Sequence, residues 1–301
     1  MDQLAGQCVF VLIPTHTTRH LAACLASLAH QTRMPDGVVL TCDNDLPEIA
    51  ALVRDWWPKV CQRAGVQIPF WHAMRPHQGQ PRLNQVRNNG LRALIGWAGA
   101  VSTDLVVVLD GDTMLEPRAV EKHAALRDAG AELIIPFRIM LGEQATAALT
   151  PESLLAGGVP DTLLTPEDAA ALKKRHARYL RQMFFRFFGI GKPQKPKIIG
   201  GHHAATVGLI QRVNGFDEQY TGYGFDDDDL SRRMNLLRPR VDARIAVRDI
   251  MSYHLWHPTR AAGKPAEFSG FARFSQPGLP LQAERGIINP MPQPEVSVMS
   301  L

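Results

Sequence analysis

The chain has 301 residues, of which 45% are hydrophobic and 21% are charged. This balance is ordinary for a globular protein, and the length allows one large domain or two small ones. The formal net charge of +4 mildly favours anionic ligands, but no basic tract is dense enough to indicate a nucleic-acid partner. No apolar stretch reaches membrane-spanning length, and Met1 to Leu4 lack the pattern that begins a signal peptide.

Cysteine usage indicates a reducing compartment. All four cysteines lie in the first quarter of the chain, and their spacing matches no zinc-finger pattern: Cys8, Cys24, Cys42 and Cys61. Free thiols are typical of reducing compartments, whereas disulfide frameworks are typical of secreted proteins. We therefore expect a cytoplasmic protein with free thiols, and the sequence carries no signal for an oligomeric state.

Strand-like and helix-like segments alternate through the first half of the chain. Continuous apolar runs predict strands over residues 8–13, 38–42, 66–71, 106–109 and 132–136. Apolar positions at helical spacing predict helices over residues 21–28, 48–57, 82–97 and 117–128, with the second ended by Pro58. This alternation predicts an α/β fold with a parallel sheet, helices on both faces and right-handed crossovers.

Polar residues directly follow several predicted strands. Thr15, Asp43, Asp110 and Asp112 all lie at predicted carboxyl ends, the edge at which α/β sheets bind ligands. Gly111 separates the last two acids, and side chains two apart on an extended chain point to the same side. Two such carboxylates suit a divalent cation that also bridges phosphate oxygens, and a turn that only ends a strand is the alternative. The chain has neither a G-x-G-x-x-G nor a P-loop sequence.

Residues 141–197 have a looser pattern, with prolines and glycines that indicate loops. A helix is predicted over residues 167–183, and its basic face is followed by the run Phe184 to Phe188. Two interpretations stay open for this run: an aromatic core cluster with solvated arginines, or an element that binds the acceptor or a membrane surface. The tail from Pro258 is rich in proline and glycine, so we expect it to wrap around the domain or to be partly disordered.

Four consecutive acids form the second strong motif. Asp226 to Asp229 precede a predicted helix over residues 230–237. Repelling carboxylates require a cation, hydrogen-bond donors or a helix N-terminus, so either a functional site or a solvated helix cap explains them. Downstream, His254 and His257 lie close together, and they are either structural histidines or metal ligands.

Taken together, these motifs resemble the family 2 glycosyltransferases of the GT-A fold. The resemblance rests on blocks that occur in the same order: Pro14-Thr15, Asp43, Arg87-Asn88, Asp110-Gly111-Asp112 (a DXD motif), Gly200-Gly201, Gly215-Phe216-Asp217-Glu218 and Gly222-Tyr223-Gly224-Phe225-Asp226-Asp227. It covers roughly residues 8–258 and is strongest for the branch of β-1,4-galactosyltransferases and bacterial chondroitin polymerases. The chain departs from the family where His202-His203 replace an Asn after the double glycine, and residues 141–197 match no part of the pattern.

The resemblance implies a Rossmann-like central sheet, mostly parallel and flanked by helices, with a smaller mixed region on the acceptor side. The catalytic domain is expected over residues 1–258. Its nucleotide-binding half spans 8–136, and its acceptor-side half spans 137–258 with the variable segment 141–197. The tail spans 259–301.

The donor implied by the resemblance is a nucleoside diphosphate sugar, most simply a UDP-sugar. Its expected contacts come from Pro14, Thr15, Arg19, Asp43, Asn44, Arg87, Asp110, Gly201 and His202. Among these, Asp43 would accept a hydrogen bond from the base imide. The expected metal ligands are Asp112, Asp110, His254 and His257, with His254 preferred over His257. Oxygen ligands with an imidazole favour Mn²⁺ over Mg²⁺.

The reaction implied is a single displacement that inverts the anomeric carbon. Asp227 would act as general base toward the acceptor hydroxyl, and Asp226 would orient a neighbouring hydroxyl. The expected acceptor is a glycan or a lipid-linked molecule of polysaccharide biosynthesis, and Arg181 to Phe188 would touch the inner face of the membrane peripherally. Two other functions stay open: a metal-dependent nucleotidyltransferase or sugar-nucleotide hydrolase, and a non-catalytic module that binds sugar nucleotides or glycans.

Overall fold

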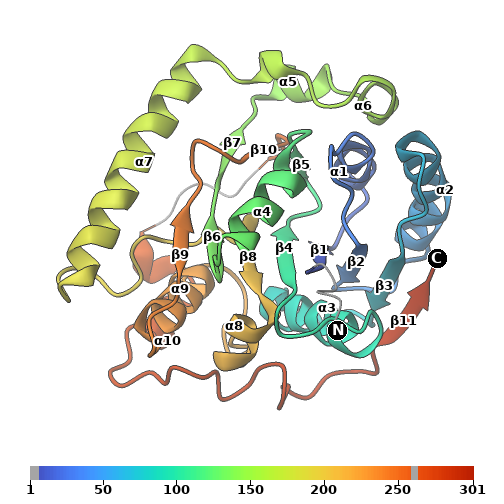
Figure 1. Ribbon diagram of the computed structural model, residues 1–301. Helices are drawn as coiled ribbons and strands as arrows, with labels where there is room; N and C mark the ends of the chain where they lie inside the picture. The colour runs from blue at the N-terminus through green and yellow to red at the C-terminus, as the bar shows by residue number, and fades with distance from the viewer. Residues whose placement is uncertain (1–6, 259–263) are drawn as a thin grey trace, which may run out of the picture.

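The computed structural model describes residues 7–258 and 264–301, so Met1 to Leu4 lie outside the described residues. Its centre is an eight-stranded sheet with the order β11-β3-β2-β1-β4-β8-β6-β9 (Figure 1). The strands of this sheet are β1 (Val9–Thr15), β2 (Gly37–Cys42), β3 (Phe70–Met74), β4 (Leu105–Leu109), β6 (Leu133–Ile135), β8 (His202–Thr206), β9 (Ala243–Ile245) and β11 (Ser297–Ser300).

Strands β3, β2, β1 and β4 run parallel to one another, so their carboxyl ends share one edge. Strand β8 runs antiparallel between β4 and β6, and its amino end therefore reaches the same edge. All residues of β1 and β4 are buried, because apolar runs of this kind are covered by helices on both sides. The predicted α/β class with a mostly parallel sheet is confirmed.

Helices cover both faces of the sheet. In Figure 1, α1, α2 and α4 lie above the sheet, and α3 and α8 lie below it. The helices are α1 (Leu21–Leu28), α2 (Pro47–Ala64), α3 (Leu83–Gly96), α4 (Ala119–Asp128), α5 (Glu143–Ala147), α6 (Pro151–Gly157), α7 (Pro166–Phe187), α8 (Val207–Arg212), α9 (Asp226–Leu236) and α10 (Phe271–Phe274), with short 3₁₀ turns at Asp161–Leu163 and Pro265–Glu267.

A second, three-stranded sheet stands beside the carboxyl edge of the first and was not predicted. It has the order β5-β10-β7 and consists of β5 (Thr113–Leu115), β10 (Met251–His254) and β7 (Phe137–Met140). Strand β10 pairs antiparallel with β5, and this register sets His254 opposite Thr113. The small sheet therefore places His254, from late in the chain, beside Thr113, which directly follows Asp112.

One local expectation is wrong. Pro58 does not end the second helix, since α2 continues to Ala64. Its ring lies on the exposed side of the helix, where the backbone bond that a proline cannot make costs least.

Of the two interpretations left open for the run Phe184 to Phe188, the structure excludes the core cluster. Helix α7 carries most of this run to the surface, where Phe187 is 65% exposed.

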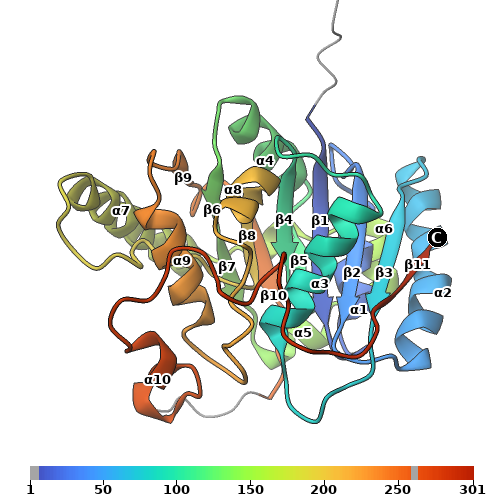
Figure 2. The same cartoon turned by 90° about the horizontal axis from the view of Figure 1, so that it is seen from below.

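The tail wraps around the domain and ends in the central sheet. Figure 2 shows residues from α10 onward passing beside α3 to β11, which pairs antiparallel with β3. The four cysteines are free thiols. Among the residues described, no helix is both long and apolar enough to cross a membrane.

Candidate active site

The carboxyl edge of the central sheet gathers the strand-end residues that the sequence singled out. Thr15 ends β1, Asp43 follows β2, and Asp110 follows β4. Because β8 is antiparallel, Gly201 directly precedes it at this edge, and its carbonyl accepts a hydrogen bond from the Asp110 backbone N–H at 3.2 Å. Pro14, buried in β1, accepts in the same way from the Gly111 N–H at 3.1 Å.

Asp112 and two imidazoles form a candidate metal centre. The Asp112 Oδ2 atom lies 3.3 Å from His254 Nε2 and 3.2 Å from His257 Nε2. One ligand atom from each of the three residues can be chosen so that all lie within 4.8 Å of one another. The second sheet causes this convergence, because the Leu255 N–H also donates to the Asp112 carbonyl at 2.9 Å.

The donor set fits a divalent transition metal. One carboxylate and two imidazoles are ligands that Mn²⁺ accepts more readily than Mg²⁺ does. His254 is buried, and its Nδ1 atom has no hydrogen-bond partner within the described residues, so the ring is held by Asp112 and by packing. Burial opposes ionisation of Asp112, but hydrogen bonding and charge from His254, Arg138 and His257 lower the pKa of Asp112 to about 2. The carboxylate is therefore ionised over the whole physiological range.

Asp110 does not join this centre. Its Oδ1 lies 3.7 Å from Arg87 Nη2, and its Oδ2 lies 3.3 Å from Arg138 Nη1. The segment Asp110 to Asp112 is a turn rather than an extended chain, so the alternation argument that aimed both carboxylates at one point does not apply. The predicted convergence of Asp110 and Asp112 on one cation is therefore not what this structure shows.

Arg87 joins the motif at the end of β4 and the acidic motif of α9. This fully buried guanidinium from α3 contacts Asp110 and also approaches Asp226 Oδ2 at 3.1 Å and Asp227 Oδ1 at 3.4 Å. Burial alone would lower the pKa of Arg87, but the three surrounding carboxylates raise it. A permanent cation thus lies between Asp110 and the two acids of α9, Asp226 and Asp227. Asp110 and these two acids are more than a hundred residues apart in the chain.

The four acids of α9 have different partners. Asp228 is paired with Lys197 at 2.6 Å and Lys195 at 3.5 Å, and Asp229 is paired with Arg232 and Arg233. Asp229 is buried, so the solvated helix cap is not the explanation for this cluster. The two remaining acids face Arg87.

Asp226 and Asp227 are set apart by their environment. The Asp227 Oδ2 atom accepts from the Gly200 N–H at 2.8 Å, and a side chain at position 200 would overlap Arg87 and Asp227. The double glycine therefore lets the backbone itself reach this carboxylate. Burial and the neighbouring Asp227 charge raise the pKa of Asp226 to about 6, although Arg87 opposes this shift.

Two arginines of the site were missed from the sequence. Arg138 lies on β7, in a stretch without a recognisable motif, and reaches Asp110. Arg75 directly follows β3, and its Nη2 donates to Asp43 Oδ1 at 2.6 Å. The other Asp43 oxygen accepts from the Arg82 N–H at 3.1 Å. The sequence signal that could have identified Arg75 is its own position, as a polar residue directly after a strand.

Three predicted donor contacts have other surroundings. His202 is fully buried, with Nε2 3.0 Å from His123 Nε2 and Nδ1 2.9 Å from Ser252 Oγ, so the structure does not bring its ring to the carboxyl edge. Asn44 donates to the His16 carbonyl at 2.9 Å. Arg19 lies exposed in the loop between β1 and α1.

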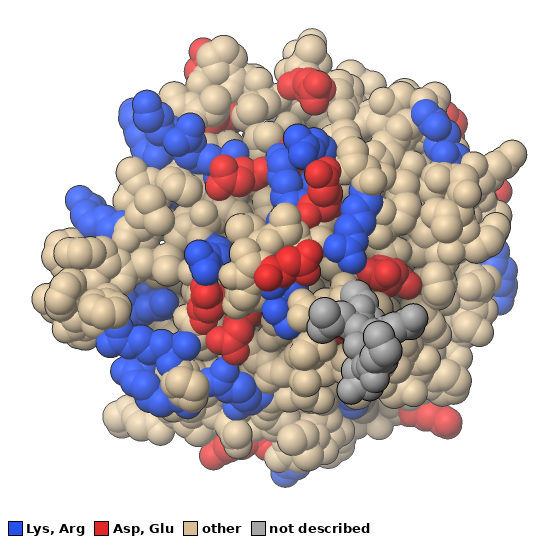
Figure 3. Space-filling view, viewed as in Figure 1, with Lys and Arg blue, Asp and Glu red and all other residues tan. Residues whose placement is uncertain are grey.

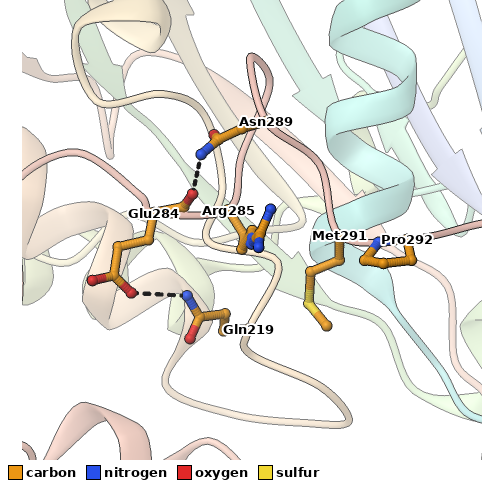
Figure 4. Close-up of a pocket in the computed structure, with 6 residues that line it drawn as sticks. All are labelled: Gln219, Glu284, Arg285, Asn289, Met291 and Pro292. Atoms are coloured by element: carbon orange, nitrogen blue, oxygen red, sulfur yellow. Dashed lines mark hydrogen bonds between the residues drawn. The ribbon is translucent and has the colours of Figure 1, made fainter.

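A cavity of about 730 Å³ lies outside this constellation. It is formed by the loop after Glu218 and by the C-terminal tail, where Glu284 accepts from Gln219 Nε2 at 3.0 Å (Figure 4). Its lining residues are Gln219, Glu284, Arg285, Asn289, Met291 and Pro292. None of them belongs to the acid and imidazole groups described above.

Comparisons with known proteins define the class. A family model described as the N-terminal domain of galactosyltransferase matches residues 185–255, which span β8, α8, α9, β9 and β10. The structure of S. aureus TarS 1-349 in complex with UDP-GlcNAc superposes with a TM-score of 0.52 at 14% identity, over 89% of this chain and 65% of that one. GalNAc-T7 with UDP, GalNAc and Mn²⁺ gives 0.52 at 13% identity, over 85% and 45%.

This chain therefore has the GT-A fold, and the predicted fold class is confirmed. The family model matches less than half of the chain. The chain spans less than two thirds of the length of either solved structure. Comparison with curated protein sequences gives no significant match.

Proposed function

We propose that the protein transfers a sugar from a nucleoside diphosphate sugar, a UDP-sugar in the first instance, to a hydroxyl of a glycan or lipid-linked acceptor. The observation that carries this proposal is the position of Arg87. It contacts both Asp110 beside the candidate metal centre and the Asp226–Asp227 pair. The carboxyl edge of the central sheet thus offers positive charge for a diphosphate leaving group and a carboxylate for an acceptor hydroxyl. Both comparison structures contain a UDP-sugar or its parts, which agrees with this donor.

The chemistry proposed is a single displacement with inversion. Asp227, held by Arg87 and the Gly200 N–H, takes the proton from the acceptor hydroxyl as its oxygen forms the bond to the anomeric carbon. The bond to the diphosphate breaks, and the diphosphate leaves with the electron pair. Asp226 hydrogen-bonds a neighbouring acceptor hydroxyl and fixes its orientation.

Asp112, His254 and His257 would hold the divalent metal, which neutralises the charge that develops on the leaving diphosphate. Arg87 and Arg138 place further positive charge next to Asp110. On the donor side, Thr15 and Asp43 are proposed to contact the nucleoside. Each Asp43 oxygen already accepts one hydrogen bond, from Arg75 or from the Arg82 N–H, and has a second lone pair for a donor on the base.

The test combines binding and transfer. UDP and UDP-sugars are titrated calorimetrically with Mn²⁺ and with EDTA, and acceptor glycosylation is followed by mass spectrometry. Wild type should bind UDP at least tenfold more tightly with Mn²⁺, and Asp112→Ala should lose this gain. Asp227→Asn should bind UDP normally but lose transfer by a factor of at least a hundred, because a general base typically contributes 10²–10⁴.

Asp228→Asn is the matched control, since Asp228 is an acid of the same run that pairs with Lys195 and Lys197 instead of Arg87. It should retain most of the transfer activity. Equal losses in the two Asn variants would remove Asp227 from the role of base. UDP binding that does not depend on metal would contradict the proposed metal centre. UDP binding without any transfer product would favour a non-catalytic module.

A further inference from the structure

Helix α7 is poorly covered by the rest of the protein. Of its 22 residues only Leu172 and Tyr179 are buried. Its middle crosses the second sheet, where the Arg175 guanidinium lies 3.7 Å from the centroid of the Phe137 ring. From there the helix runs along the left side of the molecule in Figure 1, so its C-terminal end presents side chains outward.

An aromatic cluster occupies this C-terminal end. It consists of Phe184, Phe185, Phe187 and Phe188, which are between 43% and 65% exposed, and Ile190 beside it is 59% exposed. The rings contact one another edge to face, with centroids 5.2–5.7 Å apart and interplanar angles of 65–82°. Several large apolar side chains gathered at one exposed place indicate an interaction site rather than the scattered exposure of an ordinary surface.

The surroundings of the cluster are strongly basic. Residues 169–197 contain nine Lys and Arg and no Asp or Glu. Two of the nine, Lys195 and Lys197, are paired with Asp228, so the charge of the proposed surface comes from the remaining seven. Arg240 adds a further cation from a distant segment, with its guanidinium 4.7 Å from the Phe187 ring centroid. Among the described residues, no carboxylate lies within 4.0 Å of the basic side chains of α7. Figure 3 shows Lys and Arg grouped just below the tan projection at the left edge, where α7 ends in Figure 1.

We propose that the aromatic cluster and these basic residues form a docking surface for an anionic phospholipid membrane. The rings would enter the headgroup region, and the cations would lie against lipid phosphates, the arrangement by which amphipathic basic segments bind membrane surfaces. This inference goes beyond the proposed function and does not depend on it. Binding to a membrane would not test any of the catalytic roles proposed above.

Two other occupants fit the surface less well. A second copy of this chain would bring one basic surface against another, and like charges repel. A single-stranded nucleic acid would use aromatic rings as flat stacking platforms, whereas these rings stand edge to face and fill one another's faces. A membrane surface needs only apolar bulk beside positive charge.

Vesicle flotation with the full chain tests the proposal. Vesicles of phosphatidylcholine alone are compared with vesicles that contain about one third phosphatidylglycerol. Wild type should bind the anionic vesicles, and the binding should weaken in 0.5 M NaCl. Arg178→Glu with Arg181→Glu should reduce partitioning at least about 25-fold, since each basic residue near an anionic surface contributes about fivefold. Phe184→Ser with Phe187→Ser should reduce it at least tenfold.

Matched controls change equally exposed residues elsewhere. Trp97→Ser with Ile288→Ser removes two apolar side chains that are 64% and 81% exposed, and Arg63→Glu with Arg248→Glu reverses two exposed charges outside residues 169–197. These variants should partition like wild type to within twofold. The proposal is overturned if wild type ignores anionic vesicles or if controls lose as much as the α7 variants. It is equally overturned if the Phe variants abolish self-association, or oligonucleotide binding, without any effect on vesicles.

Discussion

At the level of single residues, the site depends on how one buried arginine and three carboxylates share a small volume. Arg87 compensates Asp110, Asp226 and Asp227, yet one guanidinium cannot neutralise three carboxylates. The residual repulsion falls on Asp226, whose pKa burial and Asp227 raise to about 6. Raised pKa values of this kind mark groups whose ionisation costs free energy in the folded state.

The raised pKa of Asp226 predicts a stability difference that depends on pH. The folded state binds this proton more tightly than the unfolded state, whose Asp has its usual pKa near 3.9. The cost of ionised Asp226 is therefore fully present above pH 6 and disappears as the pH falls toward 4. In EDTA, Asp226→Asn should be more stable than wild type by roughly 1–3 kcal/mol at pH 7.5, and urea unfolding at pH 7.5 and pH 4 measures this.

The difference between the two proteins should shrink to within error at pH 4, where wild-type Asp226 is itself protonated. A variant that is less stable than wild type at pH 7.5 would show that the Arg87 contact outweighs burial and repulsion. Asp45→Asn, an exposed acid on a loop, is the control, and it should change stability little at either pH.

The sequence predicted which acid and imidazoles lie close together better than it predicted the partners of the site residues. Asp112, His254 and His257 do lie close together. The sequence could indicate this grouping because the resemblance to a known family gave the order of the motifs along the chain. Asp110 and Asp112 separate, since the turn between them is set by pairing of β5 with β10, which lie far apart in the chain. Arg138 was missed because no local pattern distinguishes a site arginine from a solvated one. Roles of individual residues stay predictions.

At the level of elements, helix α3 carries Arg87 to the site and must pack closely to do so. Gly90, one turn further along α3, faces β1 and β2, where a Cβ atom would overlap the Leu12 side chain and lie 2.9 Å from Thr41 Cγ2. The Thr41 hydroxyl also donates to the Val86 carbonyl of the helix at 2.8 Å. The missing side chain thus sets the distance between helix and sheet.

Gly90→Ala should therefore destabilise the protein by about 1–3 kcal/mol, as overpacking of a core does, even though Ala favours a helix by about 1 kcal/mol over Gly. The control is Gly96→Ala in the same helix, where a Cβ would meet nothing within 4 Å. That variant should be neutral or slightly more stable. Urea unfolding of both variants measures the contrast, and a Gly90→Ala protein as stable as wild type would mean that α3 can shift at no cost.

Most elements with long periodic or apolar runs were predicted well. Of the three-residue strands, β6 lies within one residue of its prediction, and β5 and β9 were not predicted. Helix α1 occupies its expected residues, and β1, β2 and β4 lie within two residues of theirs. The three-residue strands β5 and β9 carry too few positions for a period to show. The prediction that Pro58 ends its helix was wrong because the effect of a proline depends on which side of α2 faces solvent. That is a property of the tertiary structure.

At the level of the whole molecule, the tail is tied to helix α3 and to the stretch Gly215 to Glu218 through a buried acid. Glu218 follows the Gly215-Phe216-Asp217 stretch and is fully buried. Its carboxylate accepts from Gln85 and Asn88 of α3, from Arg92 at 3.3 Å, and from the backbone N–H of Met291 in the tail at 2.7 Å. Glu218 thus connects helix α3, the stretch Gly215 to Asp217 and the tail.

Glu218→Ala should leave an arginine and two amides without their shared partner. A loss of about 3–5 kcal/mol in the free energy of unfolding is expected for a broken buried ion pair, together with faster proteolysis in residues 284–296. Glu284→Ala, an exposed acid of the same tail, should change neither. Limited proteolysis and urea unfolding report the outcome, and an unchanged cleavage rate would mean that β11 alone anchors the tail.

The position of strand β11 affects the tendency of the protein to associate with other copies of itself. By pairing with β3 it occupies the backbone groups of that strand and becomes the edge strand itself. Bare sheet edges recruit strands from neighbouring molecules, and a very short edge strand limits this recruitment. A tag or fusion that displaces residues 297–300 would uncover β3 and open a route to polymerisation that leaves the carboxylates and imidazoles untouched.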